Sequence, residues 1–100
     1  MLWAYDFECD KTIEEIILTL NEAGPWRWIW RDKDALGPYI SSVPLEGVRA
    51  RIYYAEGPTY TADFKLGVAC SAERSTLDDV LGDLLGKLNA RNVSECEGYD

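Results

Sequence analysis

Residues 25–32, PWRWIWRD, place a tryptophan at every second position from Trp26 to Trp30. Arg27 and Arg31 lie at positions of the opposite parity. Side chains that alternate with a period of two residues point to opposite faces of a β-strand. The stretch therefore predicts a strand whose tryptophans face a core and whose arginines stand on the other face of the sheet. A platform of rings that binds a ligand or a base stays open as the alternative.

Other segments of the chain have the same period. Residues 2–9 alternate between apolar and polar side chains. Residues 48–55 and 59–70 also alternate, and Gly57–Pro58 between them is typical of a hairpin turn. A shorter strand is expected at 39–43. These segments predict a sheet built mainly from neighbouring antiparallel strands.

Two segments have the period of an amphipathic helix. Thr12 and Glu15 have the spacing of a capping box, although Asp10 could also begin the first helix, and Gly24–Pro25 ends it. Ser75 is the expected N-cap of the second helix. The apolar stripes consist of Ile13, Ile16, Ile17 and Leu20 in the first helix, and of Leu77, Val80, Leu81, Leu84, Leu85 and Leu88 in the second.

The resulting order is β-α-β-β-β-β-α, and a final short strand around residues 93–96 is left open. This order predicts an α+β fold: a mostly antiparallel sheet of four to five strands with two helices packed on one face. A variant of the ferredoxin-like sandwich is the expected topology. With 100 residues, the chain forms one domain, 1–100, and a disordered tail is expected from about residue 95.

If the helices cover one face of the sheet, each strand sends its apolar side chains there. The expected core contains Trp3, Tyr5, Phe7, Trp26, Trp28, Trp30, Val48, Ala50, Ile52, Tyr54, Tyr60, Phe64, Leu66 and Val68. The opposite, open face would carry the candidate binding residues Arg27, Ile29, Arg31, Arg49, Arg51, Tyr53 and Lys65. These residues either form cross-strand ion pairs with neighbouring carboxylates or bind a carboxylate, a phosphate or an acidic partner.

A second candidate surface is the outer side of the two helices. It would carry Glu14, Glu15, Leu18, Glu22, Asp79 and Asp83. Gly82 and Gly86 lie four residues apart on the second helix, where glycine is unfavourable. We expect them to form a shallow groove in which another backbone comes close, either that of the first helix or that of a second subunit.

The charge of the chain restricts its partners. It has 18 acidic and 10 basic residues and a net charge of −8. A chain this acidic is a poor binder of nucleic acids and is repelled by anionic membranes. It attracts basic proteins, although the same charge could serve solubility alone. The first ten residues lack the features of a signal peptide, so we expect a cytoplasmic protein.

No residue pattern indicates catalysis, a cofactor or a metal. The chain has no histidine, which removes the commonest general base and metal ligand. Its three cysteines lack metal-binding spacing, and no phosphate-binding glycine motif is present. We therefore expect no catalytic residues, no cofactor and no metal site, and these observations favour a protein that is not an enzyme over one that is.

Two functions fit these observations. The first is a non-enzymatic acidic interaction module that binds a basic protein partner. Bacterial immunity proteins and other small inhibitors of basic toxins or nucleases are similar in size and charge, a likeness of class that no motif makes specific. The alternative is a ligand-binding or enzymatic ferredoxin-like homodimer with an anion site on its arginine-rich sheet face.

Overall fold

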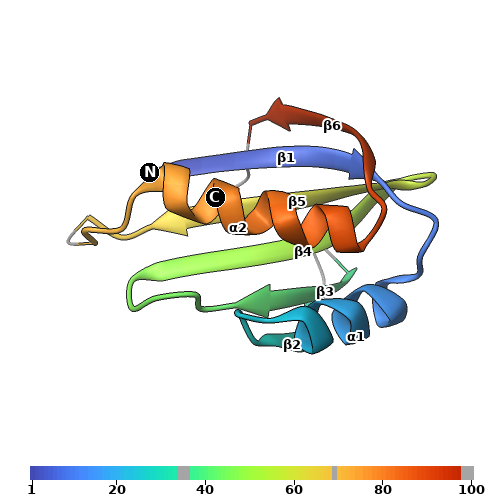
Figure 1. Cartoon of the computed structure of the whole chain (residues 1–100), viewed down its shortest axis with the longest axis horizontal. Helices are drawn as coiled ribbons and strands as arrows, with labels where there is room; N and C mark the ends of the chain where they lie inside the picture. The colour runs from blue at the N-terminus through green and yellow to red at the C-terminus, as the bar shows by residue number, and fades with distance from the viewer. Residues whose placement is uncertain (34–36, 69, 98–100) are drawn as a thin grey trace.

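The computed structural model describes residues 1–33, 37–68 and 70–97. They form one antiparallel sheet and two helices (Figure 1). In chain order the elements are β1 (Leu2–Glu8), α1 (Ile13–Ala23), β2 (Trp28–Lys33), β3 (Gly37–Ser42), β4 (Val48–Glu56), β5 (Thr59–Leu66), α2 (Arg74–Lys87) and β6 (Arg91–Cys96). The α+β prediction is confirmed.

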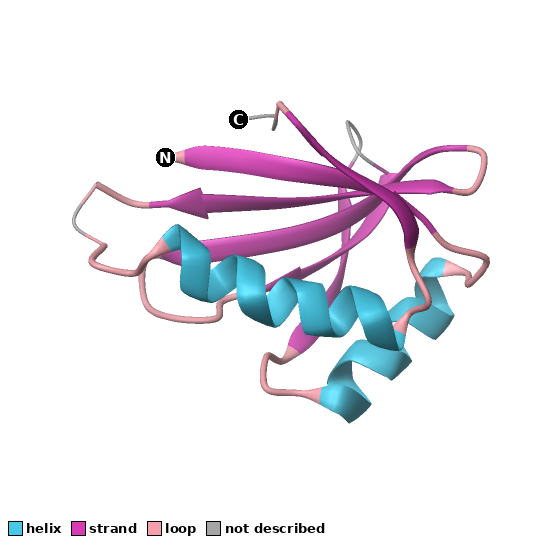
Figure 2. Cartoon of the chain, turned by 45° about the horizontal axis from the view of Figure 1, so that its top comes forward, coloured by secondary structure: helices cyan, strands magenta, loops and turns pink. Residues whose placement is uncertain are grey.

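The sheet has six strands in the order β2-β3-β4-β5-β1-β6, where the sequence predicts four to five. The additional strand is β6, for which the sequence leaves a final strand open, and it extends to Cys96, into the segment expected to be disordered. Strands β2 to β5 form a meander of hairpins, and β1 lies between β5 and β6. Both helices lie on one side of the sheet (Figure 2), and each connects two strands that are not neighbours.

Local sequence explains where α1 begins and ends. Thr12 is the N-cap, and its Oγ1 accepts the backbone N–H of Glu15 at 3.2 Å. Glu15 Oε1 in turn accepts the N–H of Thr12 at 2.9 Å, which completes the predicted capping box. The helix ends at Gly24, whose positive φ of 62° is accessible to glycine without strain.

The start of α2 differs from the prediction. Glu73, and not Ser75, is the N-cap, and it makes no side-chain capping bond. Asp78 lies in the first turns and accepts hydrogen bonds from Trp3 Nε1 at 2.9 Å and Tyr5 Oη at 2.8 Å. Tertiary contacts to β1 therefore position this end of the helix.

The core lies between the helices and one face of the sheet. It includes Trp3, Phe7, Ile16, Leu20, Trp26, Trp28, Ile40, Val48, Ala50, Ile52, Tyr60, Phe64, Leu66, Leu77, Leu81, Leu84, Leu85 and Leu88. The rings of Trp26 and Trp28 lie 6.2 Å apart within it. Burial of these side chains is the main source of stability, at about 25 cal/mol per Å² of apolar surface.

Three residues assigned to the core are exposed instead. Val68 follows the last residue of β5, so no strand holds it against the helices. Tyr54 lies near the end of β4 and is 53% exposed. Trp30 is 44% exposed because it lies on an edge strand, which has neighbours on one side only.

Neither helix in the described residues is long and apolar enough to span a membrane.

Asp78→Ala tests the contact between α2 and β1. The change leaves the donors of Trp3 and Tyr5 without their acceptor, so we expect the free energy of unfolding to fall by about 1–3 kcal/mol. Urea denaturation measures it. Asp79→Ala, the same change at the next and exposed position, should stay within about 0.5 kcal/mol of the native value. Equal losses in both variants would contradict the assignment.

Candidate functional site

The far face is the side of the sheet opposite the helices, and the strand register sets its side chains in rows. One row runs through Ile29, Ser41, Arg51, Asp63, Ala4 and Cys96. The next runs through Arg31, Tyr39, Tyr53, Thr61, Asp6 and Ser94. Arg49 and Lys65 lie opposite each other in a third row. Arg27 is exposed and precedes β2. The register therefore places the predicted arginine positions of the strands on one face.

A buried ion pair occupies the centre of the far face. Arg51 Nε lies 3.0 Å from Asp63 Oδ1, and Arg51 Nη2 lies 2.6 Å from Asp63 Oδ2. Asp63 is 0% and Arg51 6% exposed. These hydrogen bonds raise the pKa of Arg51, although burial alone would lower it. Arg51 therefore compensates the charge of Asp63.

The expectation of an open face is wrong at Arg51 and Tyr53. Tyr53 is only 5% exposed, and the guanidinium of Arg51 lies 5.7 Å from the centre of its ring. Both residues lie on β4, a central strand, where side chains of neighbouring strands surround them. Ile29 at the edge is 44% exposed, and Arg31 and Lys65 are also exposed.

Arg49 differs from the other arginines of the far face. Its side chain is half-buried, and its Nε and Nη2 atoms are buried. Neither atom has a hydrogen-bond partner within the described part of the chain. Buried polar groups in folded proteins nearly always have such a partner. Arg49 therefore has two buried donor atoms that no hydrogen bond of the described residues satisfies.

Thr61, Asp6 and Cys96 lie together at the β6 end of the far face. Thr61 Oγ1 donates to Asp6 Oδ1 at 2.6 Å. Burial, and secondarily the neighbouring Asp6, raises the pKa of Cys96 to about 11. The thiol is therefore protonated at neutral pH and is a poor nucleophile.

The outer side of the helices carries the predicted acidic residues. Glu14, Glu15, Leu18, Glu22, Asp79 and Asp83 are all exposed, and we call them the acidic helix face. Ion pairs among the described residues use other carboxylates, those of Glu8, Asp10, Asp63, Asp78 and Glu95. Hydrogen bonds with Thr12 lower the pKa of Glu15, because they stabilise its charged carboxylate form. Among the described residues, the carboxylates of this face form no ion pair, although Lys11 lies near Glu15 and Lys87 lines a groove together with Asp83.

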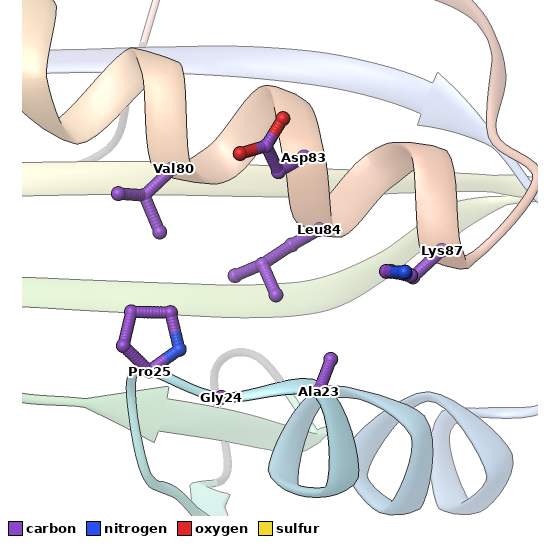
Figure 3. A pocket seen from close by; sticks show the side chains of 7 residues that line it. All are labelled: Ala23, Gly24, Pro25, Val80, Asp83, Leu84 and Lys87. Atoms are coloured by element: carbon purple, nitrogen blue, oxygen red, sulfur yellow. The ribbon is translucent and has the colours of Figure 1, made fainter.

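A groove of about 490 Å³ lies between the end of α1 and the middle of α2 (Figure 3). Its lining consists of Ala23, Gly24, Pro25, Val80, Asp83, Leu84 and Lys87. This groove is not the one predicted at Gly82 and Gly86, which are absent from its lining. Both glycines are exposed, and a Cβ at either would meet nothing within 4 Å. Neither α1 nor any other described backbone packs closely against them.

Two polar contacts that shape these surfaces were not among the expectations from the sequence. Asn21 of α1 bonds the backbone of Trp28 through both atoms of its amide, at 2.7 and 3.0 Å. Arg74 donates to Asp78, Tyr5 and Glu95, and these contacts raise its pKa. The four-residue spacing of Arg74 and Asp78 was visible in the sequence, whereas nothing local connects Asn21 with Trp28.

Comparison with known proteins adds no assignment: no known protein family matches the chain, and no curated protein is significantly similar to it. Among the described residues, no group of three or more His, Cys, Asp or Glu side chains is placed to hold a metal ion. The geometry of the surfaces is therefore the basis for the functional argument.

Asp63→Ala tests the buried ion pair. It leaves the charge of Arg51 buried without compensation, so we expect a loss of about 3–5 kcal/mol in the free energy of unfolding. Urea denaturation provides the measurement. The double variant Arg51→Met/Asp63→Leu should recover most of the loss, because it removes both charges and keeps the volume. Failure of the double variant to exceed Asp63→Ala in stability would contradict an ion-pair role.

The raised pKa of Cys96 predicts slow alkylation at neutral pH. In a Cys9→Ser/Cys70→Ser variant, the rate of reaction with iodoacetamide should increase with pH toward a midpoint of about 11. In urea the same thiol should titrate near the ordinary value of ~8.5. Asp6→Asn should lower the folded midpoint, because it removes a negative neighbour. A folded midpoint equal to that in urea would refute the effect.

Proposed function

We propose that this chain is a non-enzymatic interaction module that binds a basic protein partner through its acidic helix face. One observation carries the proposal: the arginines of the ion pairs lie on the sheet and at the start of α2, and their partners are carboxylates outside this face. The carboxylates of the acidic helix face are left exposed to solvent. A small inhibitor or immunity-like protein that masks a basic toxin or nuclease would need such a surface.

Electrostatic complementarity would act first on the rate of association. A net charge of −8 produces a field that reaches about one Debye length, ~8 Å at physiological salt. Concentrating uncompensated carboxylates on one side orients that field toward a cationic partner. Binding should therefore weaken steeply as the salt concentration increases.

The groove between α1 and α2 supplies a site for one anchoring side chain. Pro25, Val80 and Leu84 offer an apolar lining for the aliphatic stem of a lysine or arginine. Figure 3 shows Asp83 on the same stretch of α2, where its carboxylate can accept the charged end. Lys87 at the other end of the groove would direct a partner's cation toward Asp83.

A charge-matched pair of variants tests the proposal. Glu22→Gln/Asp79→Asn/Asp83→Asn neutralises carboxylates of the acidic helix face. We expect its affinity for lysozyme, used as a folded basic probe, to fall by roughly tenfold or more at low salt. Fluorescence anisotropy with labelled lysozyme measures the affinity. An arginine-rich peptide serves as a second, unfolded probe.

The control neutralises the same number of exposed carboxylates elsewhere, in Glu46→Gln/Glu56→Gln/Glu97→Gln. Both variants have equal net charge, so a difference between them reports the position of the charges and not their sum. We expect the control to retain most of the affinity. Equal weakening in the two variants, or no binding of either probe by the native chain at low salt, would reject the proposal.

Arg49 supports a second candidate, an anion site on the far face. In this interpretation the fold is a ferredoxin-like variant in which two chains pair their sheets face to face around the ligand. The buried, unbonded Nε and Nη2 atoms of Arg49 favour it, whereas the engagement of Arg51 by Asp63 removes one predicted ligand. Light scattering measures whether the chain forms the dimer that this candidate requires, and calorimetry measures whether it binds phosphate or citrate. A strict monomer that binds neither anion would exclude the anion site.

A further inference from the structure

One edge of the sheet, strand β2, has regular geometry and an unoccupied side. β2 pairs with β3 from Trp28 to Lys33 without a register shift, and no other strand formed by the described residues adjoins it. An edge strand presents backbone N–H and C=O groups that can pair with another chain. Which residues present them follows from the contacts of Trp28.

Asn21 shows the direction in which the backbone of Trp28 points. The N–H of Trp28 donates to Asn21 Oδ1 at 2.7 Å, and its carbonyl accepts from Asn21 Nδ2 at 3.0 Å. These groups therefore point away from β3, and the amide of Asn21 takes the place of a neighbouring strand. Because alternate residues of a strand point their backbone groups to the same side, those of Trp30 and Asp32 also point outward.

The residue opposite Asp32 agrees with this direction. Asp32 pairs with Pro38, which has no N–H to donate. If Asp32 pointed toward β3, its carbonyl would lack a donor there, so a proline at this position fits an outward-pointing Asp32. Helix α1 thus closes the edge at Trp28, and no hydrogen bond among the described residues closes it at Trp30.

The opposite edge of the sheet is less suited to pairing. The register of β6 with β1 shifts between Asp6 and Glu8, and Asn92 has a left-handed φ of 54°. A bulge of this kind bends and twists a strand and discourages a further partner. Arg91 and Glu95 of β6 are also engaged in ion pairs within the chain. β2 is therefore the edge available for pairing.

Side chains at the β2 edge resemble those of protein interfaces. Ile29 on the far face and Trp30 on the helix side are each 44% exposed. Arg27 and Arg31 beside them are exposed. Tryptophan and arginine are enriched among the residues that dominate binding energy. This edge gives local positive charge to a chain whose net charge is −8.

We propose that β2 binds an extended segment of a partner protein by strand addition at Trp30 and Asp32, and that this segment carries acidic side chains on the far-face side and apolar ones on the other. Backbone pairing would supply affinity, as in other cases of strand addition. Arg31 would select a carboxylate on the far face, and Trp30 would cover an apolar side chain. The proposal concerns a surface separate from the acidic helix face and does not depend on it.

A second copy of this chain fits the edge poorly. Pairing β2 with β2 of another molecule would bring Arg27 and Arg31 of both chains onto one two-stranded ribbon. It would also bring two chains of net charge −8 together. The arginines of the two strands would repel each other, and so would the net charges of the two chains. The arginines would attract an acidic segment instead.

Hydrogen exchange of single amides, followed by NMR, tests the open edge directly. In the free chain the amide of Trp30 should exchange roughly 100-fold or more faster than those of Ile29 and Arg31, which bond β3. Adding a peptide of alternating valine and glutamate should protect Trp30. A valine–lysine peptide of equal length is the matched probe and should leave Trp30 unprotected.

Asp32→Pro removes an outward N–H without removing a bond to β3, and Asp32→Ala is its matched control. We expect the proline variant to bind the valine–glutamate peptide roughly tenfold more weakly than the alanine variant, the loss expected for one backbone hydrogen bond left unmade. If the proline variant fails to fold, Arg31→Glu replaces it and should reverse the preference between the two peptides.

Three results would overturn the proposal. One is equal protection of Trp30 by both peptides, which removes the selection for acidic segments. Another is a valine–glutamate peptide that does not bind, or that binds to saturation and leaves the exchange rate of the Trp30 amide unchanged. The third is protection of Trp30 that increases with protein concentration alone, which would assign the edge to a second copy of the chain.

Discussion

The antiparallel register of the sheet is the constraint on which the other features depend. Because successive side chains alternate between faces, one register decides together which indoles enter the core and which charges meet on the far face. Trp28 enters the core for the same reason that Arg51 reaches Asp63 across the β4–β5 hairpin. A slip by one residue would place Asp63 under the helices and Phe64 on the far face, so a carboxylate would have to be buried without its arginine.

Much of this arrangement could be predicted because it is local. Alternation identified the strands, the i, i+3, i+4 spacing identified the helices, and the Thr12–Glu15 spacing gave one of the two expected starts of α1, the one that the structure has. The parity of Arg49, Arg51 and Lys65 followed from the same pattern. These features need no knowledge of which strands are neighbours.

Features that depend on the order of strands could not be predicted in the same way. The exposure of Trp30 follows from the edge position of β2, and the burial of Arg51 follows from the central position of β4. Sequence distance hides the contact of Asp78 with β1, which spans more than 70 residues. Alternation tells which side a residue faces, but not whether that side is covered at that point.

The central place of β1 has a consequence for synthesis on the ribosome. Of the described strands β1 is made first, yet its partners in the sheet, β5 and β6, are the last two in chain order. The meander from β2 to β5 consists of neighbouring hairpins and can form as it emerges, whereas β1 must wait with both of its edges bare. Until β5 emerges, the nascent chain therefore carries an unpaired, aromatic-rich segment, LWAYDFE, whose two strand edges are open to aggregation.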